Sequence, residues 1–301
     1  MGMLDTQQAR RADLEAPTTT GRLIKLFGTT SKHDKHTEAG FSECYRLGRV
    51  LGCGAFSTVR LAVDRSTGKE WACKVVTEQA ERELLLREVD ILQQLDHPNL
   101  LQYREHFSTP DSLYIITELL EGSDLMAAIL ERGSYSEDDA RDIIRQMLSA
   151  LSYLDSKGVA HRDLKMENIV LTTSADSTQV KIIDFSLSGQ LSDSKAYFTE
   201  ACGTPMFLAP EVASRVPYGT SCDVWSAGVV LFMLLSGDYP FQGNSVSELV
   251  KTIREAELRF KDPVWEITSS GAKNMVQTLL TANPAFRVSA EEALSHSWLA
   301  Q

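Results

Sequence analysis

The chain has 301 residues, of which 43% are apolar and 24% are charged, a composition that is ordinary for a soluble globular protein. Its 41 acidic and 30 basic side chains give a formal charge of −11, which argues against nucleic acid or an anionic membrane as the main partner and permits attraction to basic peptides. No apolar run approaches the ~20 residues that a helix needs to span a membrane.

The cysteines indicate a reducing compartment. Cys44, Cys53, Cys73, Cys202 and Cys222 include no Cys-x-x-Cys pair, their number is odd, and no signal peptide precedes them. This pattern is typical of reduced thiols in an intracellular protein. We therefore expect a cytoplasmic location, with the nucleus left open.

The first 43 residues differ in composition from the rest of the chain. They are rich in Thr, Gln, Lys, His and Asp, and their one apolar island lies at residues 23–27. Such a segment buries too little apolar surface to offset the entropy that is lost on ordering. We predict a disordered N-terminal extension over residues 1–43 and a folded domain over residues 44–299.

The folded domain begins with strand patterns and continues with helices. Strands are predicted at residues 45–51, 58–64, 71–76 and 113–117, and apolar residues at helical spacing predict one helix between residues 78 and 95. After residue 122 helices dominate, as the next features show.

Capping patterns and one apolar run mark the later helices. Ser136 with Asp139 begins one helix, and Ser289 with Glu292 begins another. Residues 224–235 are apolar almost all round, which predicts a buried central helix. These elements together predict an α+β fold.

The most informative motif lies between the predicted helices. Residues 161–168 read His-Arg-Asp-Leu-Lys-Met-Glu-Asn and place a carboxylate, a lysine and an amide on one short loop. Phosphoryl transfer to a hydroxyl needs these groups together. Asp163 can accept the hydroxyl proton, Lys165 can neutralise the moving phosphoryl group, and Asn168 can hold Mg²⁺.

A glycine-rich turn joins the first two predicted strands. Residues 51–59 read Leu-Gly-Cys-Gly-Ala-Phe-Ser-Thr-Val, in which Gly52 and Gly54 let the backbone approach phosphates where a Cβ would clash. Two glycines alone usually mark only a hairpin. Here Lys74 follows in the next strand, where an unpaired buried charge would be costly, so the order favours phosphate binding.

Three further motifs complete the series: Glu88 in the predicted helix, Asp184-Phe185 after a strand, and Ala209-Pro210-Glu211. With all of them in order, the chain resembles the catalytic domain of a eukaryotic-type protein kinase over about residues 45–299. The resemblance implies a bilobal fold. A small β-rich N-lobe with one helix would cover about residues 44–120, and a larger, mainly helical C-lobe about residues 121–299.

The resemblance also implies ATP and Mg²⁺ as cofactors. Asp163, Lys165 and Asn168 match the family's catalytic positions, and Asn168 and Asp184 match its metal ligands. The residues implied for the ATP site are Leu51, Gly52, Cys53, Gly54, Ala55, Phe56, Ser57, Thr58, Val59, Ala72, Lys74, Glu88, Glu118, Leu120 and Asp124.

Supporting contacts are implied as well. Lys74 is expected to pair with Glu88, and Glu211 with Arg287, while Asp223 is expected to anchor the backbone of the catalytic loop. For Glu88 the alternative is a solvated helix glutamate, and Glu83 and Asp90 are rival acids that lie outside the family's pattern. For Glu211, Arg287 and Asp223, charged surface positions are an unconvincing alternative within such apolar sequence.

The chain departs from the family pattern at two serines. Ser57 stands at the third glycine position of the turn, and Ser186 replaces the glycine that follows Asp184-Phe185. Glycine at the position of Ser186 would let the backbone flip, whereas serine restricts that motion. We expect altered switching between active and inactive arrangements, with the chemistry retained.

Several segments narrow the resemblance to one group. Lys165 and residues 203–205 resemble Ser/Thr kinases, and residues 237–241, 260–265 and 293–299 resemble the calcium/calmodulin-dependent protein kinase group. The substrates implied are proteins with basic sites, in which an arginine stands three residues before the Ser or Thr. Asp124 and Glu167 match the positions that pair with that arginine, whereas Met233 disfavours a second one nearer the site.

Two regulatory expectations follow from the resemblance. The usual activating phosphosite falls on Glu200, whose carboxylate could pair with Arg162 in place of phosphate; an exposed loop glutamate is the plain alternative. No EF-hand pattern is present, and the chain stops at Gln301, before the regulatory tail that is common in the group. Calcium control is therefore expected to need a separate calcium-sensor partner or a longer natural chain.

Two other functions remain in view. A pseudokinase scaffold or ATP-binding regulatory module would keep the fold without catalysis, and Ser57 and Ser186 are its only support. A small-molecule phosphotransferase of related fold is disfavoured by residues 209–211 and by the peptide-binding acids.

Overall fold

The computed structural model describes residues 38–53, 57–77, 79–173, 178–192 and 194–300. The predicted extension as far as residue 37, and Gly54, Ala55 and Phe56 of the glycine-rich turn, lie outside the described residues.

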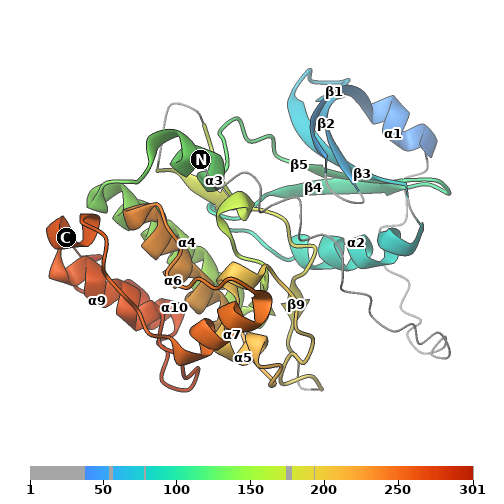
Figure 1. Ribbon diagram of the computed structural model, residues 1–301. Coiled ribbons are helices and arrows are strands. Elements are labelled where there is room, and N and C mark those ends of the chain that lie inside the picture. The colour runs from blue at the N-terminus through green and yellow to red at the C-terminus, as the bar shows by residue number, and fades with distance from the viewer. Residues whose placement is uncertain (1–37, 54–56, 78, 174–177, 193, 301) are drawn as a thin grey trace. The chain divides into compact units, whose positions relative to one another are not determined.

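A five-stranded antiparallel sheet forms the N-terminal part of these ranges (Figure 1). Its strands lie in the order β1-β2-β3-β5-β4. The four predicted strands are present, whereas the sequence pattern does not predict β4, because Arg104 and Glu105 interrupt its apolar residues. The bounds are β1 (Tyr45–Cys53), β2 (Thr58–Asp64), β3 (Glu70–Val76), β4 (Tyr103–Ser108) and β5 (Leu113–Thr117).

Each face of this sheet packs against one helix, as Figure 1 shows. Successive side chains of a strand point to opposite faces. Leu113 and Ile115 of β5 therefore pack with helix α2 (Gln79–Leu92), and Tyr114 and Ile116 pack with helix α1 (Glu38–Cys44).

Helix α1 differs from the sequence-based expectation, which begins the folded domain at residue 44. The Phe41 side chain is 6% exposed and stacks on Tyr114, with 4.1 Å between ring centroids. It also meets the edge of Phe107 at 5.5 Å. Burial of the Phe41 ring favours this short helix, and the polar composition of the segment does not reveal that burial.

Helices dominate the remainder, and none in the described ranges is long and apolar enough to cross a membrane. They are α3 (Leu125–Arg132), α4 (Glu137–Ser156), α5 (Pro210–Ala213), α6 (Ser221–Ser236), α7 (Val246–Glu255), α8 (Val264–Ile267), α9 (Ser270–Leu279) and α10 (Ala290–Leu294). Two two-stranded sheets pair β6 (Val159–Ala160) with β9 (Gly189–Gln190) and β7 (Ile169–Leu171) with β8 (Val180–Ile182). Short 3-10 helices lie at Met166–Asn168 and Pro205–Phe207.

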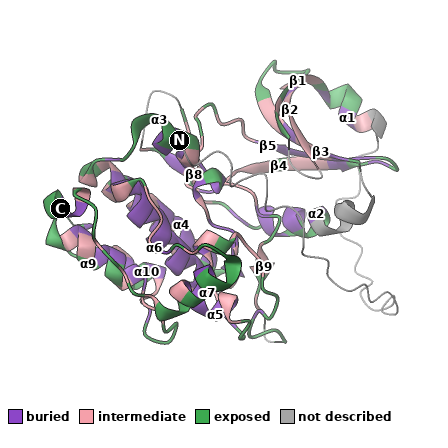
Figure 2. Cartoon of the chain, in the orientation of Figure 1, coloured by how far each residue is buried: buried purple, intermediate pink, exposed green. Residues whose placement is uncertain are grey.

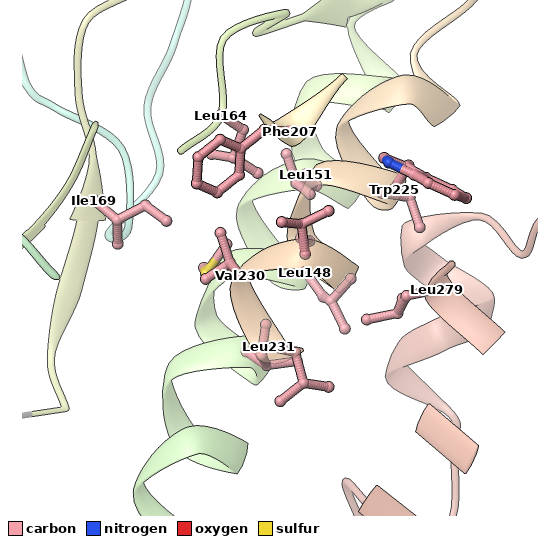
Figure 3. Packing of buried hydrophobic residues seen from close by; sticks show 14 of the residues in the cluster. Leu148, Leu151, Leu164, Ile169, Phe207, Trp225, Val230, Leu231 and Leu279 are labelled. Atoms are coloured by element: carbon pink, nitrogen blue, oxygen red, sulfur yellow. The ribbon is translucent and has the colours of Figure 1, made fainter. Parts of the chain in front are cut away.

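Helix α6 lies at the centre of the helical core, as the apolar run predicts. Every residue from Cys222 to Leu235 is buried, and Figure 2 shows the helix in purple. Figure 3 shows Trp225 and Val230 of α6 among Leu148 and Leu151 of α4 and Leu279 of α9. This packing fixes α6 as a rigid base for the loops that follow α4.

Capping contacts set the helix ends. Ser136 Oγ accepts a hydrogen bond from the Asp139 amide at 3.1 Å, at the start of α4. Ser289 and Glu292 form the complete capping box that the sequence predicts for α10.

The first residue of α4 also ties three distant segments together. Glu137 accepts hydrogen bonds from the amide and hydroxyl of Ser269, at 2.6 and 2.7 Å, and from Trp298 Nε1 at 3.1 Å. Burial would raise the pKa of this carboxyl, but the Ser269 and Trp298 donors outweigh it and hold the pKa below its usual value.

Candidate active site

Asp223 of α6 holds the backbone of the loop at residues 161–168, as predicted. Its two carboxylate oxygens accept the amides of His161 and Arg162 at 2.6 and 2.9 Å. Arg162 has a φ of +66°, a strained value for a residue with a side chain. Burial raises the pKa of the Asp223 carboxyl. The two amide hydrogen bonds to Asp223 therefore lie away from water and have a structural role.

His161 links this loop to the segment that carries Asp184. The His161 ring is fully buried, and its Nε2 lies 2.9 Å from the carbonyl oxygen of Ile183. Phe185 is also buried and meets the imidazole edge to face, with 4.9 Å between centroids. Phe185, the residue after Asp184, therefore packs against the histidine of the catalytic loop.

The Asp163 carboxylate is held from both sides. Lys165 Nζ donates to Oδ2 at 2.7 Å, and Thr204 Oγ1 donates to Oδ1 at 2.7 Å. Asn168 Nδ2 donates to the Asp163 carbonyl oxygen at 2.9 Å. The structure thus brings the three predicted catalytic residues together and adds Thr204.

Thr204 is a site residue that the catalytic-loop motif does not reveal. It lies 41 residues beyond Asp163 in the chain, and its hydroxyl also accepts from Lys165 Nζ at 3.2 Å. The sequence signal that could have found it is the Gly203-Thr204-Pro205 string, which marks Ser/Thr specificity only by resemblance.

Lys74 joins the sheet to helix α2 through the predicted pair. Its Nζ lies 2.8 Å from Glu88 Oε2 and 3.5 Å from Asp184 Oδ1. Burial alone would lower the pKa of the ammonium group, but the two carboxylates outweigh it and raise the pKa. Lys74 is therefore a charged group beside Asp184, placed to meet an anionic ligand.

Asp184 is held in an uncommon backbone conformation, with a φ of +62°. Burial would raise the pKa of its carboxyl, but Lys74 and the hydrogen bonds of Ser186 outweigh it and lower the pKa. Ser186 is exposed and does not have a positive φ, so the serine at the family's glycine position fits this arrangement without strain.

The donor set suits Mg²⁺ that is shared with a phosphate ligand. The described residues hold no group of three or more His, Cys, Asp or Glu side chains arranged for a metal ion. Asp184 and Asn168 supply two oxygen donors, and Mg²⁺ is usually bound by one or two protein groups together with phosphates and waters. The residues present therefore fit the metal that the family uses.

The described part of the glycine-rich turn is open for a ligand. Gly52 pairs with Val59 across the β1–β2 ladder, and Val59 pairs with Lys74 on β3. A Cβ added at Gly52 would meet no protein atom within 4 Å, so packing within the described protein does not require glycine there. A ligand that approaches the backbone would explain it.

The other predicted ATP-site residues of this region lie in β1, β2 and β3 or, for Ser57, just before β2. They are half-buried or exposed, which suits a ligand surface: Leu51, Cys53, Ser57, Thr58 and Ala72. Cys53 pairs with Thr58, and Ala72 pairs with Leu61.

Glu118, Leu120 and Asp124 follow β5, and two of them have structural partners. The Glu118 carboxylate pairs with Lys181 Nζ at 2.8 Å and accepts the Gln102 amide at 2.7 Å. Asp124 caps α3 by accepting the Ala127 amide at 2.8 Å. Because its carboxylate is already engaged, we expect Glu118 to contact a nucleotide through its backbone.

Two arginine–carboxylate pairs flank the segment between Asp184 and α6. Arg287 binds Glu211 through two bonds of 2.7 and 3.0 Å, as predicted. Arg162 Nη1 lies 3.3 Å from Glu200 Oε2, and Lys195 Nζ lies 3.7 Å from the other oxygen. The Glu200 backbone amide, Lys195 and Arg162 lower the pKa of the Glu200 carboxyl, so it is ionised at neutral pH.

Comparison with known proteins gives a family match over most of the chain. A family described as the protein kinase domain matches residues 45–299. Mouse (Mus musculus) serine/threonine-protein kinase 33 is 41% identical over 273 residues, which are 87% of this chain and 56% of the mouse protein. The chain thus spans little more than half the length of that relative.

Two further relatives are matched over more of their length. Myosin light chain kinase A of Dictyostelium discoideum is 39% identical over 85% of this chain and 88% of that protein. Human calcium/calmodulin-dependent protein kinase type 1B is 38% identical over 88% of this chain and 77% of that protein. The group that the motifs predict is therefore among the relatives.

Proposed function

The chain belongs to the protein kinase family, and on that premise we propose that it is an active serine/threonine protein kinase. It transfers the γ-phosphoryl group of ATP, with Mg²⁺, to Ser and Thr hydroxyls of proteins. The observation that carries this proposal is the arrangement around Asp163. Its carboxylate, Lys165 and Thr204 lie in mutual hydrogen-bond contact while the Lys74–Glu88 pair is closed.

Each side chain has a defined task in this reaction. Asp163 accepts the proton of the substrate hydroxyl, and Lys165 neutralises charge that develops on the phosphoryl group. Lys74, oriented by Glu88, holds phosphate oxygens of the nucleotide. Asp184 and Asn168 would hold Mg²⁺, which when bound offsets the negative charge of the phosphates.

The geometry favours an active enzyme over a pseudokinase scaffold. A pseudokinase can lose its catalytic groups or their alignment, whereas here every such group among the described residues is present and in contact with its partners. The two serine departures do not disturb this, because neither Ser57 nor Ser186 has the positive φ that would require glycine.

We further propose a preference for arginine three residues before the Ser or Thr. Glu167 is exposed, and Asp124 is half-buried with one carboxylate oxygen used in capping α3. Glu167 stands in the catalytic loop itself, and Asp124 forms a β-bridge with Val170, two residues after Asn168. Two acids on this surface suit a guanidinium group.

We also propose that Glu200 acts as a built-in substitute for an activating phosphate. Its contact with Arg162, the residue before Asp163, supports this role. A carboxylate carries less charge than phosphate, so its effect is expected to be weaker.

A direct transfer assay tests the activity and the preference together. The dephosphorylated full chain is incubated with γ-labelled ATP, Mg²⁺ and two serine peptides that differ only by Arg or Ala at the third residue before the serine. We expect transfer to both, at a rate about tenfold higher for the arginine peptide. The matched variant Asp163→Ala should bind ATP and transfer at least about 100-fold more slowly.

The outcomes separate the two claims. Equal rates on the two peptides would reject the arginine preference and leave the kinase activity standing. ATP binding without transfer to any protein or peptide, in wild-type chain and Asp163→Ala alike, would favour the pseudokinase.

A further inference from the structure

Phe198 is an exception within the segment that precedes Thr204. Among the described residues from 191 to 201, Phe198 is the one buried side chain, with 0% exposure. Its neighbour Tyr197 is 62% exposed. A fully buried aromatic ring in an otherwise exposed loop is a point of attachment, because the apolar area it removes from water holds the loop in place.

The backbone and ring of Phe198 are both engaged. Its amide donates to the Tyr218 carbonyl oxygen at 2.9 Å, and the Tyr218 amide donates back at 3.0 Å. The two rings lie 5.5 Å apart. Opposite them, a Cβ at Gly189 would lie 2.7 Å from Phe198 Cε1 and 3.1 Å from Arg162 Cζ, so only glycine lets β9 pass this close.

The face of the Phe198 ring meets two cations. Arg162 Cζ lies 4.8 Å from the ring centroid, and Lys195 Nζ lies 5.4 Å from it. Both distances are within the range of cation–π attraction, which is strongest where water is excluded. The Arg162 side chain is only 13% exposed, so its guanidinium group lies in such a place.

Arg162 transmits this contact in two directions. Its Nε donates to the Leu187 carbonyl oxygen at 2.7 Å and its Nη2 to that of Ser188 at 3.4 Å, on the segment that follows Asp184. Its backbone leads directly into Asp163 in a strained conformation. A group that fixes the guanidinium therefore acts on the metal-ligand segment and on the catalytic loop at once.

We propose that Phe198 is a positioning residue of the phosphoryl-transfer site: its ring face holds the Arg162 guanidinium and thereby the alignment of Asp163. The assignment rests on the proposed kinase function. It differs from the Glu200 proposal in the kind of interaction, which is an enclosed cation–π contact and not an exposed ion pair. Glu200 is 60% exposed, so salt screens its charge, whereas the Phe198 contact is enclosed and persists at high salt.

The test compares three proteins. Phe198→Leu keeps an apolar side chain of similar reach and removes the ring face, Phe198→Ala removes both, and Tyr197→Ala changes the exposed neighbour as a matched control. Steady-state kinetics, the midpoint of thermal unfolding and amide hydrogen exchange of residues 161–163 are measured for each. The hydrogen-exchange measurement does not need an active enzyme.

We expect Phe198→Leu to lower kcat about tenfold, with KM for ATP and the unfolding midpoint near those of the wild type. Exchange at residues 161–163 should become faster in this variant and stay unchanged in Tyr197→Ala. Phe198→Ala should give a larger loss of kcat together with a lower unfolding midpoint.

Three results would overturn the proposal. They are a wild-type kcat in Phe198→Leu, a loss of kcat that only parallels a fall in the unfolding midpoint, and unchanged exchange at residues 161–163. If the wild-type chain transfers no phosphate, the proposed function fails, and faster exchange in Phe198→Leu would still support the positioning contact.

Discussion

Two arginine–carboxylate pairs hold the segment between Asp184 and α6 by the same chemistry in opposite surroundings. Near α6, Arg287 and Glu211 form a bidentate pair, with side chains that are 0% and 3% exposed. Eleven residues earlier than Glu211, Glu200 makes a single contact of 3.3 Å with Arg162, and the side chains of Arg162 and Glu200 are 13% and 60% exposed.

The buried pair is complete in its hydrogen bonding. Besides Glu211, Arg287 donates to the carbonyl oxygens of Thr281, Ala282 and Ser221 at 2.9, 3.2 and 2.9 Å. A buried pair of this kind is tolerated because each donor has a partner, and loss of one member leaves a charge without water or counter-ion.

The exposed pair differs, because more than half of the Glu200 side chain is exposed to water. Water and salt compete for Glu200, so the pair is held only weakly and can be replaced at little cost in stability. The Glu211 contact is therefore a fixed part of the fold, whereas the Glu200 contact can change at little cost in stability.

Breaking the buried pair should have the largest effect. Glu211→Ala leaves the Arg287 guanidinium buried and unpaired, and we expect a loss of about 3–5 kcal/mol in the free energy of unfolding. Urea unfolding at constant slope measures it. Glu257→Ala is the matched control, since Glu257 binds Arg259 at 2.7 Å with both side chains more than half exposed, and it should leave the midpoint unchanged. Equal midpoints for the two variants would contradict the distinction.

The Glu137 carboxylate is half-buried, between the buried Glu211 and the exposed Glu200, and its contribution to stability can be tested by changing the pH. Glu137→Gln should lower the free energy of unfolding by about 1.5–3 kcal/mol at pH ~7, because charged hydrogen bonds to Ser269 and Trp298 are lost. The pKa of Glu137 is lowered by folding, so its contribution is present above the unfolded pKa and disappears as pH falls through the lowered folded value.

Unfolding of the two proteins is therefore compared between about pH 7 and pH 3, across the range where glutamate titrates. We expect the difference between wild type and Glu137→Gln to shrink as the pH falls. A difference that stays constant with pH would show that the charge of Glu137 contributes nothing.

Removing the exposed charge should have the smallest effect on stability and a clear effect on rate. In dephosphorylated protein, Glu200→Gln should lower kcat about threefold to tenfold and leave the unfolding midpoint unchanged. Raising the ionic strength from about 0.05 M to about 0.5 M should lower wild-type kcat toward that of the variant. Thr199→Ala, next to it and exposed, is the control and should keep wild-type kcat. Protein that is inert until Thr199 is phosphorylated would refute the built-in activator.

Sequence motifs predict the contacts that chemistry constrains most tightly. Lys74 with Glu88 and Arg287 with Glu211 are charges in apolar surroundings, so each needs a partner and the motif order names it. Asp223 is assigned by its match to the family's motif, and its carboxylate accepts the two amides of the catalytic loop. These groups also carry most of the candidate site.

What the sequence does not reveal depends on distant packing. Phe198 looks like any loop residue until Tyr218, Gly189 and Arg162 surround it. Glu137 lies 161 residues from Trp298, and no local pattern links them. Helix α1 is missed for a similar reason, since one ring on a polar segment gains its burial only from strands that come later in the chain.

That ring has a consequence for where the molecule can be cut. The family match begins at residue 45, directly after α1 ends at Cys44. A protein trimmed to the match would uncover one face of Tyr114 and part of Phe107, which Phe41 covers. Bare aromatic surface on a sheet promotes self-association. The family match and the packed sheet surface thus begin at different residues, and we expect protein trimmed to residue 45 to self-associate more than protein that keeps α1.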